Sequence, residues 1–411
     1  MDFELSEEQK ALRALTRDFC EKEVDWKYLV QLADKPVTPE NARDRMPWDL
    51  IKKAHDIGLR TLSVPEQYGG GGASRLTQFI VAEELGYSGG PFGTIITGNW
   101  KHARDLALWG TEEQKEEFLT KFMNDYRYTI AASWHEAGPN IGAGYPYDAP
   151  PGEGLQTFAY KDGDEWVING EKDYCSGGGV ADLIFVTTKI RKDKPMSQSG
   201  AVFLVPTDTP GFSIARINNF MSNPNRVNAA LRFENCRIPA RYLFGEENKG
   251  SVQMHNRLAG KIVHLGCLIG WAQKIYELAK EYTKTRIQGG QPIFEHKNIG
   301  TKVVELGLLI ESARLLCYRG CWEEDRADKD RGLTSMGAFW YFKCAAYWKG
   351  VLPRICGILP DILGGISMEK ELPYESFIRE MFMWLHGGYT VSGCQIEVMG
   401  QIDKWMPTGR M

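Results

Sequence analysis

The sequence predicts an α+β protein in which a helical segment, a β segment and a second helical segment follow one another. Apolar residues recur at helical spacing up to about residue 128 and again from about residue 250. Between them, residues 129–243 contain short β-branched runs separated by turn residues. Helices and strands segregated in this way predict separate layers rather than alternating βαβ units. We therefore divide the chain into residues 1–128, 129–243 and 244–411.

The composition narrows the classes of function. Of the 411 residues, 43% are hydrophobic and 25% are charged, and the net charge of −4 gives no general attraction to nucleic acid. No apolar run approaches the ~20 residues that a membrane span needs, and the acidic, amphipathic start is unlike a signal peptide. The nine cysteines are scattered without two pairs at metal-ligand spacing. We expect a cytoplasmic protein with reduced thiols, no metal, and no membrane or nucleic acid as partner.

The first segment combines helices with one prominent loop. Ser6 is a suitable residue to begin the first helix, and the run Val64–Gly72, with one proline and four glycines, predicts the loop. A helical pattern returns in residues 79–85 and 112–122. Four apolar residues of the first helix share one face, namely Leu5, Leu12, Leu15 and Phe19.

The middle segment predicts an antiparallel β unit, and the last segment predicts long helices. A turn at residues 161–164 precedes a strand, and the glycine- and proline-rich residues 137–157 predict an irregular loop. The predicted strands include residues 165–168, 183–188 and 201–205. The predicted C-terminal helices cover Lys261–Arg286, Lys302–Trp322 and Met336–Leu352.

Short motifs in a fixed order give the chain a resemblance to the acyl-CoA dehydrogenases. They are Leu-Ser-Glu-Glu-Gln at 5–9, Gly-Leu-Arg at 58–60, Val-Pro-Glu-Gln-Tyr-Gly-Gly at 64–70, Gly-Thr-Glu-Glu-Gln-Lys at 110–115, Asn-Gly-Glu-Lys at 169–172, Thr-Pro-Gly-Phe at 209–212, Phe-Glu-Asn-Cys-Arg-Ile-Pro at 233–239, Leu-Gly-Gly at 363–365, and Pro373 with Arg379. The resemblance implies a helical domain, a middle β domain and a C-terminal four-helix bundle. It also implies bound FAD, an acyl-CoA substrate, and an electron-transfer flavoprotein or oxygen as electron acceptor.

The resemblance places one half of the FAD site in the β segment. The strand that ends in Trp134 and His135 resembles the family strand that bonds the pyrimidine edge of the flavin, with His135 where the family has Thr. Tyr174 replaces the Trp that covers the ring, and Ser176 replaces the Thr that bonds flavin N5. An imidazole beside the ring would alter its electrophilicity or simply replace one donor by another.

The other half of the FAD site falls in the last segment. Arg286 resembles the Arg that meets the pyrophosphate of the neighbouring subunit's FAD, a role that suits a bidentate guanidinium. Asp361 stands where the family has Gln before the glycine pair Gly364 and Gly365. Thr390 resembles the Thr that contacts cofactor from the next subunit. Sites shared between subunits imply a homo-oligomer, which in this family is usually a tetramer.

Both positions at which the family carries its catalytic glutamate are glycine here. The usual base position, nine residues after Arg379, is Gly388, and the position used by a smaller branch is Gly260. The family base removes the α-proton of the thioester while the flavin takes the β-hydride. The sequence therefore predicts a vacant base position at both places.

Several interpretations of the vacant positions stay open. The chain is a silent partner subunit, or an ordinary dehydrogenase with a base elsewhere (His386, Glu136 or His264), or an enzyme that needs no base. In the last case an α-carboxylate leaves as CO2, as in oxidation of benzylmalonyl-CoA, and two glycines would relieve repulsion with that anion. Loss of sulfinate by a desulfinase follows the same logic. A flavin monooxygenase on this fold is a further alternative.

The resemblance also predicts which residues line the acyl pocket. By resemblance Thr94, Thr97 and Trp100 line it, and Trp100 suits an aromatic tail unless it is a core residue. Lys261 replaces a family Arg and could meet CoA or a substrate carboxylate. No Arg lies near residues 92–93, where glutaryl-type enzymes hold a distal carboxylate.

Overall fold

The computed structural model describes residues 4–136, 154–222, 224–249, 259–331 and 338–402. By their contacts, the residues form two compact units. The sheet unit comprises residues 25–74 and 95–258, and the helical unit comprises residues 1–24, 75–94 and 259–411. The helices of predicted segment 1–128 are shared between the two units, so the units cut across the three predicted segments.

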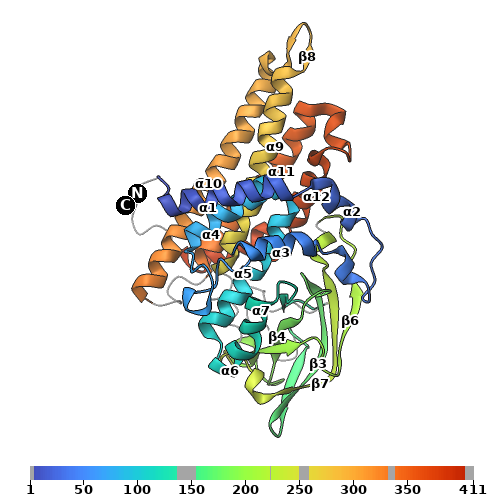
Figure 1. The fold of residues 1–411 in the computed structure, drawn as a ribbon, viewed down its shortest axis with the longest axis vertical. Helices are drawn as coiled ribbons and strands as arrows, with labels where there is room; N and C mark the ends of the chain where they lie inside the picture. Colours follow the sequence, from blue (N-terminus) through green and yellow to red (C-terminus); the bar gives the residue numbers. More distant parts are fainter. Residues whose placement is uncertain (1–3, 137–153, 223, 250–258, 332–337, 403–411) are drawn as a thin grey trace. The chain divides into compact units, whose positions relative to one another are not determined.

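A seven-stranded sheet forms the centre of the sheet unit (Figure 1). Its strands are β1 (Ile130–Ser133), β2 (Phe158–Asp162), β3 (Glu165–Cys175), β4 (Leu183–Lys189), β5 (Gly200–Pro206), β6 (Phe212–Ile217) and β7 (Ala229–Pro239). Their order is β1-β4-β2-β3-β7-β6, and β5 pairs with β4. Most ladders are antiparallel, as predicted, but β1 and β2 run parallel to β4. The predicted turn is confirmed, because β2 and β3 form a hairpin in which Asp162 pairs with Glu165.

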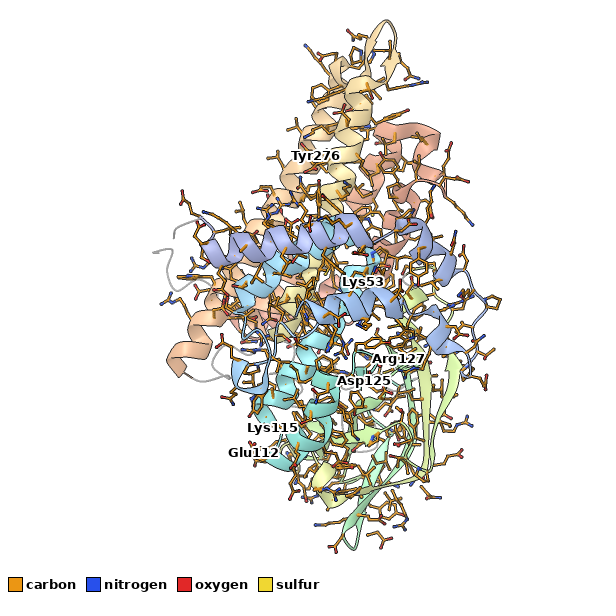
Figure 2. The ribbon with its side chains drawn as sticks, in the orientation of Figure 1. Lys53, Glu112, Lys115, Asp125, Arg127 and Tyr276 are labelled. Carbon is orange, nitrogen blue, oxygen red and sulfur yellow. The ribbon has the colours of Figure 1, made fainter. Side chains whose placement is uncertain are left out.

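The sheet unit also contains helices. They are α2 (Trp26–Ala33), α3 (Trp48–Asp56), α5 (Pro91–Trp109), α6 (Glu112–Gln114), the π-helical turn η3 (Lys115–Leu119) and α7 (Thr120–Asn124). Leu106 of α5 and Phe118 of η3 pack into the core of the sheet. Thr111 caps α6 in a reciprocal capping box with Gln114, which fixes the helix start. Figure 2 shows the side chains of Glu112 and Lys115, which form an ion pair at this helix start.

The helical unit contains seven helices in its described part. They are α1 (Glu7–Glu23), α4 (Arg75–Gly89), α9 (Ile262–Thr285), α10 (Lys297–Arg331), α11 (Phe339–Leu363), α12 (Pro373–Trp384) and α13 (Val391–Met399). A short hairpin, β8 (Ile287–Gln288) and β9 (Gln291–Pro292), joins α9 to α10. Short 3₁₀ turns occur in both units. Those of the sheet unit are Ala42–Arg45, Glu66–Tyr68, Met196–Gln198, Pro224–Arg226 and Ala240–Tyr242, and those of the helical unit are Ala259–Lys261 (η7), Ile293–Glu295 and Gly364–Met368.

Glycines bring α4 and α9 into backbone contact. A Cβ at Gly86 would lie 1.9 Å from the carbonyl oxygen of Cys267, and one at Gly270 would lie 1.9 Å from that of Glu83. No side chain fits at either position, so these two helices pack closer than ridges of larger residues allow. This close contact defines where α9 runs through the helical unit.

The predicted limits of α9 are confirmed within one residue, whereas α10 begins five residues before the predicted helix and ends nine residues after it. Ser6 caps α1 as predicted, with Gln9 as its reciprocal partner. The largest difference is α11, which continues past Pro353 to Leu363, because buried Ile355 and Leu359 keep the helix packed. By length and composition alone, Phe339–Met368 could cross a membrane, but its inner face packs on α9, α10 and α13. The predicted start at Met336 and most of the predicted loop 137–157 lie outside the described residues.

Candidate functional site

The strand that resembles the flavin-binding strand is held from both sides. Asn99 of α5 accepts a hydrogen bond from the Ile130 amide at 3.0 Å, at the start of β1. β1 then pairs in parallel with β4 up to Ser133. The Ser133 hydroxyl is fully buried, and the weakly polar Cys175 thiol is its side-chain neighbour among the described residues. A buried hydroxyl of this kind is expected to meet a polar group of a ligand or a water.

Tyr174 presents an aromatic ring at the surface of the sheet unit. Its backbone is left-handed (φ +55°), and its amide donates to the Asp173 carboxylate at 2.7 Å. The side chain is 54% exposed and stacks on Phe220, with the ring centres 6.1 Å apart and the planes 10° apart. A non-glycine residue in this conformation is strained, and the exposed ring suits a planar group stacked on it.

The side chain of Asp173 is saturated by donors that fix the neighbourhood of Tyr174. Asn218 donates to it at 2.8 Å, and Arg216 forms an ion pair with it. Two residues beyond Tyr174, the Ser176 hydroxyl is exposed and accepts from Asn228 at 3.3 Å. The strand end therefore offers one exposed aromatic face and one exposed hydroxyl, and their roles at the flavin ring and its N5 atom stay predictions from the resemblance.

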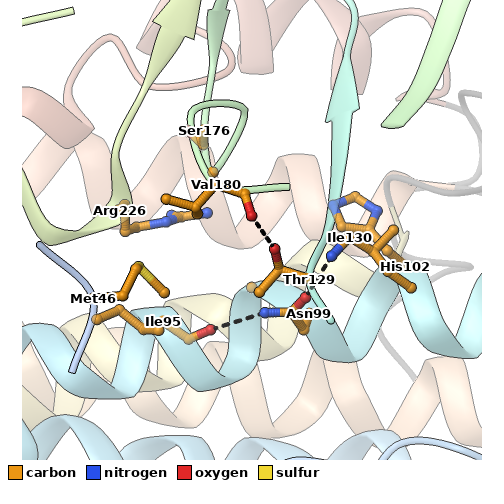
Figure 3. Close-up of a pocket in the computed structure, with 11 residues that line it drawn as sticks. Met46, Ile95, Asn99, His102, Thr129, Ile130, Ser176, Val180 and Arg226 are labelled. Carbon is orange, nitrogen blue, oxygen red and sulfur yellow. Dashed lines mark hydrogen bonds between the residues drawn. The ribbon is translucent and has the colours of Figure 1, made fainter. Parts of the chain in front are cut away.

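A small pocket of about 40 Å³ lies beneath the Ser176 loop (Figure 3). Asn99 bridges Ile95 and Ile130 on one side of it, and the Thr129 hydroxyl donates to the carbonyl of Val180 at 2.6 Å on the other. The remaining lining comes from Met46, Gly98, His102, Ser176, Gly177 and Arg226. The volume suits one or two waters and is far too small for an acyl chain. Through the hydrogen bond between Asn99 and Ile130, the lining of this pocket ties α5 to the start of β1.

The sequence did not predict a buried ion pair on α5. Lys101 and Asp105 are both buried, with Nζ and Oδ2 3.1 Å apart, and the ammonium lies 5.3 Å from the centre of the Trp134 ring. Lys101 continues the helical face of Thr94 and Thr97, both of which are buried. Only the helical spacing from Thr97 could have indicated this lysine from the sequence.

Trp100 packs away from that face. It is 1% exposed, and its indole donates to the carbonyl of Leu59 at 2.8 Å. Its own carbonyl accepts from the Ser63 hydroxyl at 2.8 Å. The structure therefore gives Trp100 a packing role, which is the alternative that the sequence left open.

Glu136 has no capacity left to act as a base. Its carboxylate accepts from the amides of Gln156 and Thr157, at 2.6 and 2.8 Å, and from the buried Lys172 ammonium at 2.9 Å. Burial alone would raise the pKa of Glu136, but the ammonium and the amide donors outweigh it and lower the pKa. Glu136 and Lys172 form a structural ion pair beside the strand end.

In the helical unit, the predicted base position Gly388 faces a cation. Its backbone is left-handed (φ +82°), and a Cβ built on it would lie 3.4 Å from the Lys261 ammonium and 3.8 Å from the Tyr341 hydroxyl. The carbonyls of the two flanking residues, Gly387 and Tyr389, both accept from the ammonium of Lys349. Gly260, the second predicted base position, is buried next to Lys261 in η7, immediately before α9. The structure thus brings Gly388 close to the ammonium of Lys261, the residue that follows Gly260 in the chain.

The two histidines considered as alternative bases have different surroundings. His386 lies two residues before Gly388, and His264 lies three residues after Lys261. His386 is exposed, and its amide donates to the carbonyl of Met383 at 3.2 Å. The ring of His264 lies against that of Trp384, with the centres 5.0 Å apart. The Trp384 indole in turn donates to Glu380 at 2.9 Å.

The remaining predicted FAD residues of the helical unit are at its surface. Arg286 is exposed at the end of α9, and Asp361 pairs with Lys302 at 2.8 Å. Gly364 (φ +66°) ends α11 and precedes Gly365. Thr390 caps α13, with its hydroxyl accepting from the Gly393 amide at 3.0 Å.

Comparison with known proteins decides between a fold likeness and kinship. Models of the N-terminal, middle and C-terminal domains of acyl-CoA dehydrogenase match residues 6–125, 151–236 and 248–387. The chain belongs to the acyl-CoA dehydrogenase family. A probable acyl-CoA dehydrogenase YngJ of Bacillus subtilis is 30% identical over 92% of this chain and 94% of its own.

Solved structures share the acyl-CoA dehydrogenase fold over nearly the whole chain. Butyryl-CoA dehydrogenase from Megasphaera elsdenii has a TM-score of 0.83 at 24% identity, covering 98% of this chain and 100% of its own. The prolyl acyl carrier protein oxidase AnaB has a TM-score of 0.85 at 21% identity, covering 97% of this chain and 100% of its own. The predicted fold class is therefore confirmed.

The residues of the sheet unit fit the cofactor of this family, which is FAD. Three observations support the fit: the buried hydroxyl of Ser133, the exposed ring of Tyr174 and the exposed hydroxyl of Ser176. Tyr174 can stack on a planar ring system, and Ser176 can donate to a ring nitrogen. The protein is an FAD-dependent oxidoreductase of the acyl-CoA dehydrogenase type.

Proposed function

We propose that the protein oxidises an acyl-CoA that carries a carboxylate on its α-carbon, and that this carboxylate leaves as CO2. The observation that carries the proposal is the geometry at Gly388, whose missing side chain points at the Lys261 ammonium, 3.4 Å from the Cβ site. The Tyr341 hydroxyl lies 3.8 Å from the same point. An ammonium and a phenol are hydrogen-bond donors, suited to holding an anion where relatives place a carboxylate.

The proposed step needs no base. The bond between the α-carbon and its carboxylate breaks, CO2 leaves, and the electron pair of that bond forms the double bond between the α- and β-carbons. FAD, when bound, supplies the two-electron acceptor for the hydride that leaves the β-carbon. Charge balances because the carboxylate's negative charge departs with the hydride, so no proton has to be removed. The products are CO2 and a 2,3-enoyl-CoA, and an arylmalonyl-CoA such as benzylmalonyl-CoA is a suitable substrate.

Lys261 would orient the carboxylate in this reaction. The bond to the departing CO2 must lie parallel to the π orbitals of the thioester carbonyl, because the new electron pair delocalises there. A charged hydrogen bond from Lys261 restricts rotation about that carbon and favours this geometry. The saturated carboxylate of Glu136 supports the proposal, because it removes one of the three alternative bases.

The test is anaerobic mixing of the FAD-loaded protein with benzylmalonyl-CoA and, separately, with the matched acyl-CoA that lacks the carboxylate. Flavin absorbance and CO2 are followed together. Bleaching with one CO2 per flavin, for the carboxylated substrate alone, is the expected result. Bleaching by the plain acyl-CoA would overturn the proposal and favour His386 as the base of an ordinary dehydrogenase. If neither substrate bleaches the flavin, the remaining candidates are desulfination and a silent partner subunit.

A homotetramer is part of the proposal. Three apolar side chains on one face of α10 are exposed, namely Val304, Leu308 and Leu315, and Leu308 is 64% exposed. Their spacing of four and seven residues makes a continuous stripe, which in a soluble helix is expected to be covered by another subunit. Leu308→Glu should shift the mass seen by light scattering from four chains toward smaller species. An unchanged mass would contradict this use of the stripe.

The proposal also includes an electron acceptor and a cellular compartment. Electrons would pass to an electron-transfer flavoprotein or to oxygen, in the cytoplasm. Rapid mixing of the reduced protein with oxygen separates the two acceptors: reoxidation within seconds favours oxygen, and a reduced flavin that persists for minutes favours a flavoprotein partner.

A further inference from the structure

A lysine with no role in the sequence predictions lies behind the base position. Lys349 is in the middle of α11 and is only 1% exposed. Its ammonium donates to the carbonyl of Gly387 at 2.8 Å and to that of Tyr389. These carbonyls belong to the residues immediately before and after Gly388. The ammonium therefore contacts the loop of residues 387–389 on both sides of the base position.

Burying this charge is costly, and a packing role does not require it. A lysine side chain taken out of water loses the hydration of its ammonium, and neutral carbonyl oxygens replace that hydration only in part. A methionine would fill a similar volume on α11 without this cost. What the ammonium supplies, and a methionine cannot, is two donors directed at one loop.

We infer that Lys349 is a positioning residue, which holds the loop of residues 387–389 so that the base position stays directed at Lys261. The inference rests on the proposed function for the role of Gly388. Gly388 has a left-handed backbone (φ +82°) and, as a glycine, many alternative conformations of similar energy. Without an external tie, the loop would sample them, and the direction from Gly388 to the Lys261 ammonium would vary.

The tie depends on protonation. Burial lowers the pKa of Lys349 to about 8, and the nearby Cys394 thiol opposes the shift only in part. The other titratable groups near it in the described part of the unit include the Cys394 thiol, with a pKa raised to about 11 by burial, and the Glu397 carboxyl, with a pKa also raised by burial. Burial likewise raises the pKa of the Tyr341 and Tyr389 phenols, and Lys261 and His386 are the remaining charged or titratable neighbours of the loop. As pH rises through about 8, Lys349 becomes a neutral amine and a weaker donor.

Two consequences of this titration have opposite signs. The folded-state pKa of Lys349 lies below its ordinary value of 10.5, so the unfolded chain binds the proton more tightly. Between about pH 8 and 10.5 the contribution of Lys349 to the unfolding free energy therefore becomes more favourable to the fold. The loop, in contrast, becomes less well held over the same range. A side chain that only fills space would change neither quantity.

Hydrogen exchange of the backbone amides of His386 and Gly387 tests the inference without any substrate. Both amides donate to the carbonyl of Met383. In Lys349→Met we expect them to exchange at least tenfold faster than in the wild type at pH 7, while those of α1 are unchanged. In the wild type, protection corrected for intrinsic rates should fall between pH 7 and pH 9. Lys349→Arg should keep it at both values. Equal protection of all three proteins at both pH values would overturn the inference.

The pH dependence of turnover adds a second test. With the carboxylated substrate, kcat/KM of the wild type should fall above about pH 8, whereas Lys349→Arg should keep its activity to higher pH. The same alkaline decline in Lys349→Arg would overturn the positioning role. If the wild type does not turn over this substrate at all, the proposed function fails, and the hydrogen-exchange result still decides the role of Lys349.

Discussion

The strand end of the sheet unit and the Gly388 loop of the helical unit treat charge in opposite ways. At the strand end, the buried carboxylates Glu136 and Asp173 are present but saturated by ammonium, guanidinium, amide and Asn donors. At the loop, Gly388 carries no side chain, the Lys261 ammonium lies 3.4 Å from the point where a Cβ would stand, and the Lys349 ammonium donates to the carbonyl of Gly387. The two regions therefore differ in what their charged groups contact: donors saturate the carboxylates at the strand end, whereas the cations at the loop lie beside a glycine and backbone carbonyls.

The most direct way to break this comparison is Gly388→Glu. A carboxylate at this position gives the plain acyl-CoA a base, and general-base catalysis contributes about 10²–10⁴-fold. The same charge should repel the α-carboxylate of a malonyl-type substrate and lower its kcat/KM. The left-handed backbone at Gly388 adds a strain of about 1–2 kcal/mol.

Gly388→Gln is the matched control, since it carries the same strain and volume without the charge. Flavin bleaching by the plain acyl-CoA is the measurement. If the Glu and Gln variants react at equal rates, the loop is not the base position.

A second change tests whether the strand-end carboxylates are structural. Lys172→Met leaves Glu136 buried without its cation, and breaking a buried ion pair costs about 3–5 kcal/mol of unfolding free energy. Urea denaturation of the FAD-saturated protein measures the loss. The double variant Glu136→Gln, Lys172→Met should regain part of it.

The same pair predicts an acid sensitivity. Because the folded-state pKa of Glu136 is lowered, its stabilising contribution is present above the ordinary carboxyl pKa and is lost as pH falls through the lowered value. The double variant should lose less stability than the wild type over that range. Equal losses would assign the acid sensitivity to other carboxyls.

Lys261→Met tests whether the Gly388 loop binds the carboxylate of the substrate. Loss of one hydrogen bond to a charged group costs about 1.5–3 kcal/mol, so KM for the carboxylated substrate should rise about 10- to 100-fold. Binding of the plain acyl-CoA, followed as a shift in the flavin spectrum, should change little. Lys261→Arg, which keeps the charge, should retain most of the affinity. Equal weakening for both thioesters would instead place Lys261 on the CoA moiety.

The smallest expected effect is that of Ser176→Ala at the strand end. One hydrogen bond contributes about 0.5–1.5 kcal/mol, so FAD affinity should fall about tenfold or less. Ser176→Thr keeps the hydroxyl and is the control. Fluorescence titration of the apoprotein with FAD measures both. An unchanged affinity in the alanine variant would show that Asn228 is the only partner of this hydroxyl.

The sequence predicted features that depend on neighbouring residues, such as helix caps and hairpins. It did not predict which distant segments lie side by side. The cap at Ser6 and the hairpin at residues 161–164 depend on neighbouring residues, and the structure has both. The parallel pairing of β1 with β4 was missed, because strand patterns carry no information on which strand lies alongside.

The site shows the same division. The prediction of Tyr174 and Ser176 as flavin residues rests on the motif that surrounds them. The ion pair of Lys101 with Asp105 and the buried Lys349 could not, because a lysine in a helical pattern is ordinarily a surface residue. Their burial depends on helices that meet only in three dimensions.

The backbone contact between α4 and α9 fixes the position of α9 relative to α4. Gly86 and Gly270 leave no clearance, so α9 can neither slide along α4 nor move away from it without breaking that contact. α9 begins at Ile262, directly after Lys261. The position of the Lys261 ammonium therefore depends on the helix contact at Gly270, roughly 13 Å further along α9. A single methyl group at Gly270 would push α9 away from α4. Such a variant would misplace the cation, and lose turnover, while every residue that touches cofactor or substrate stays the same.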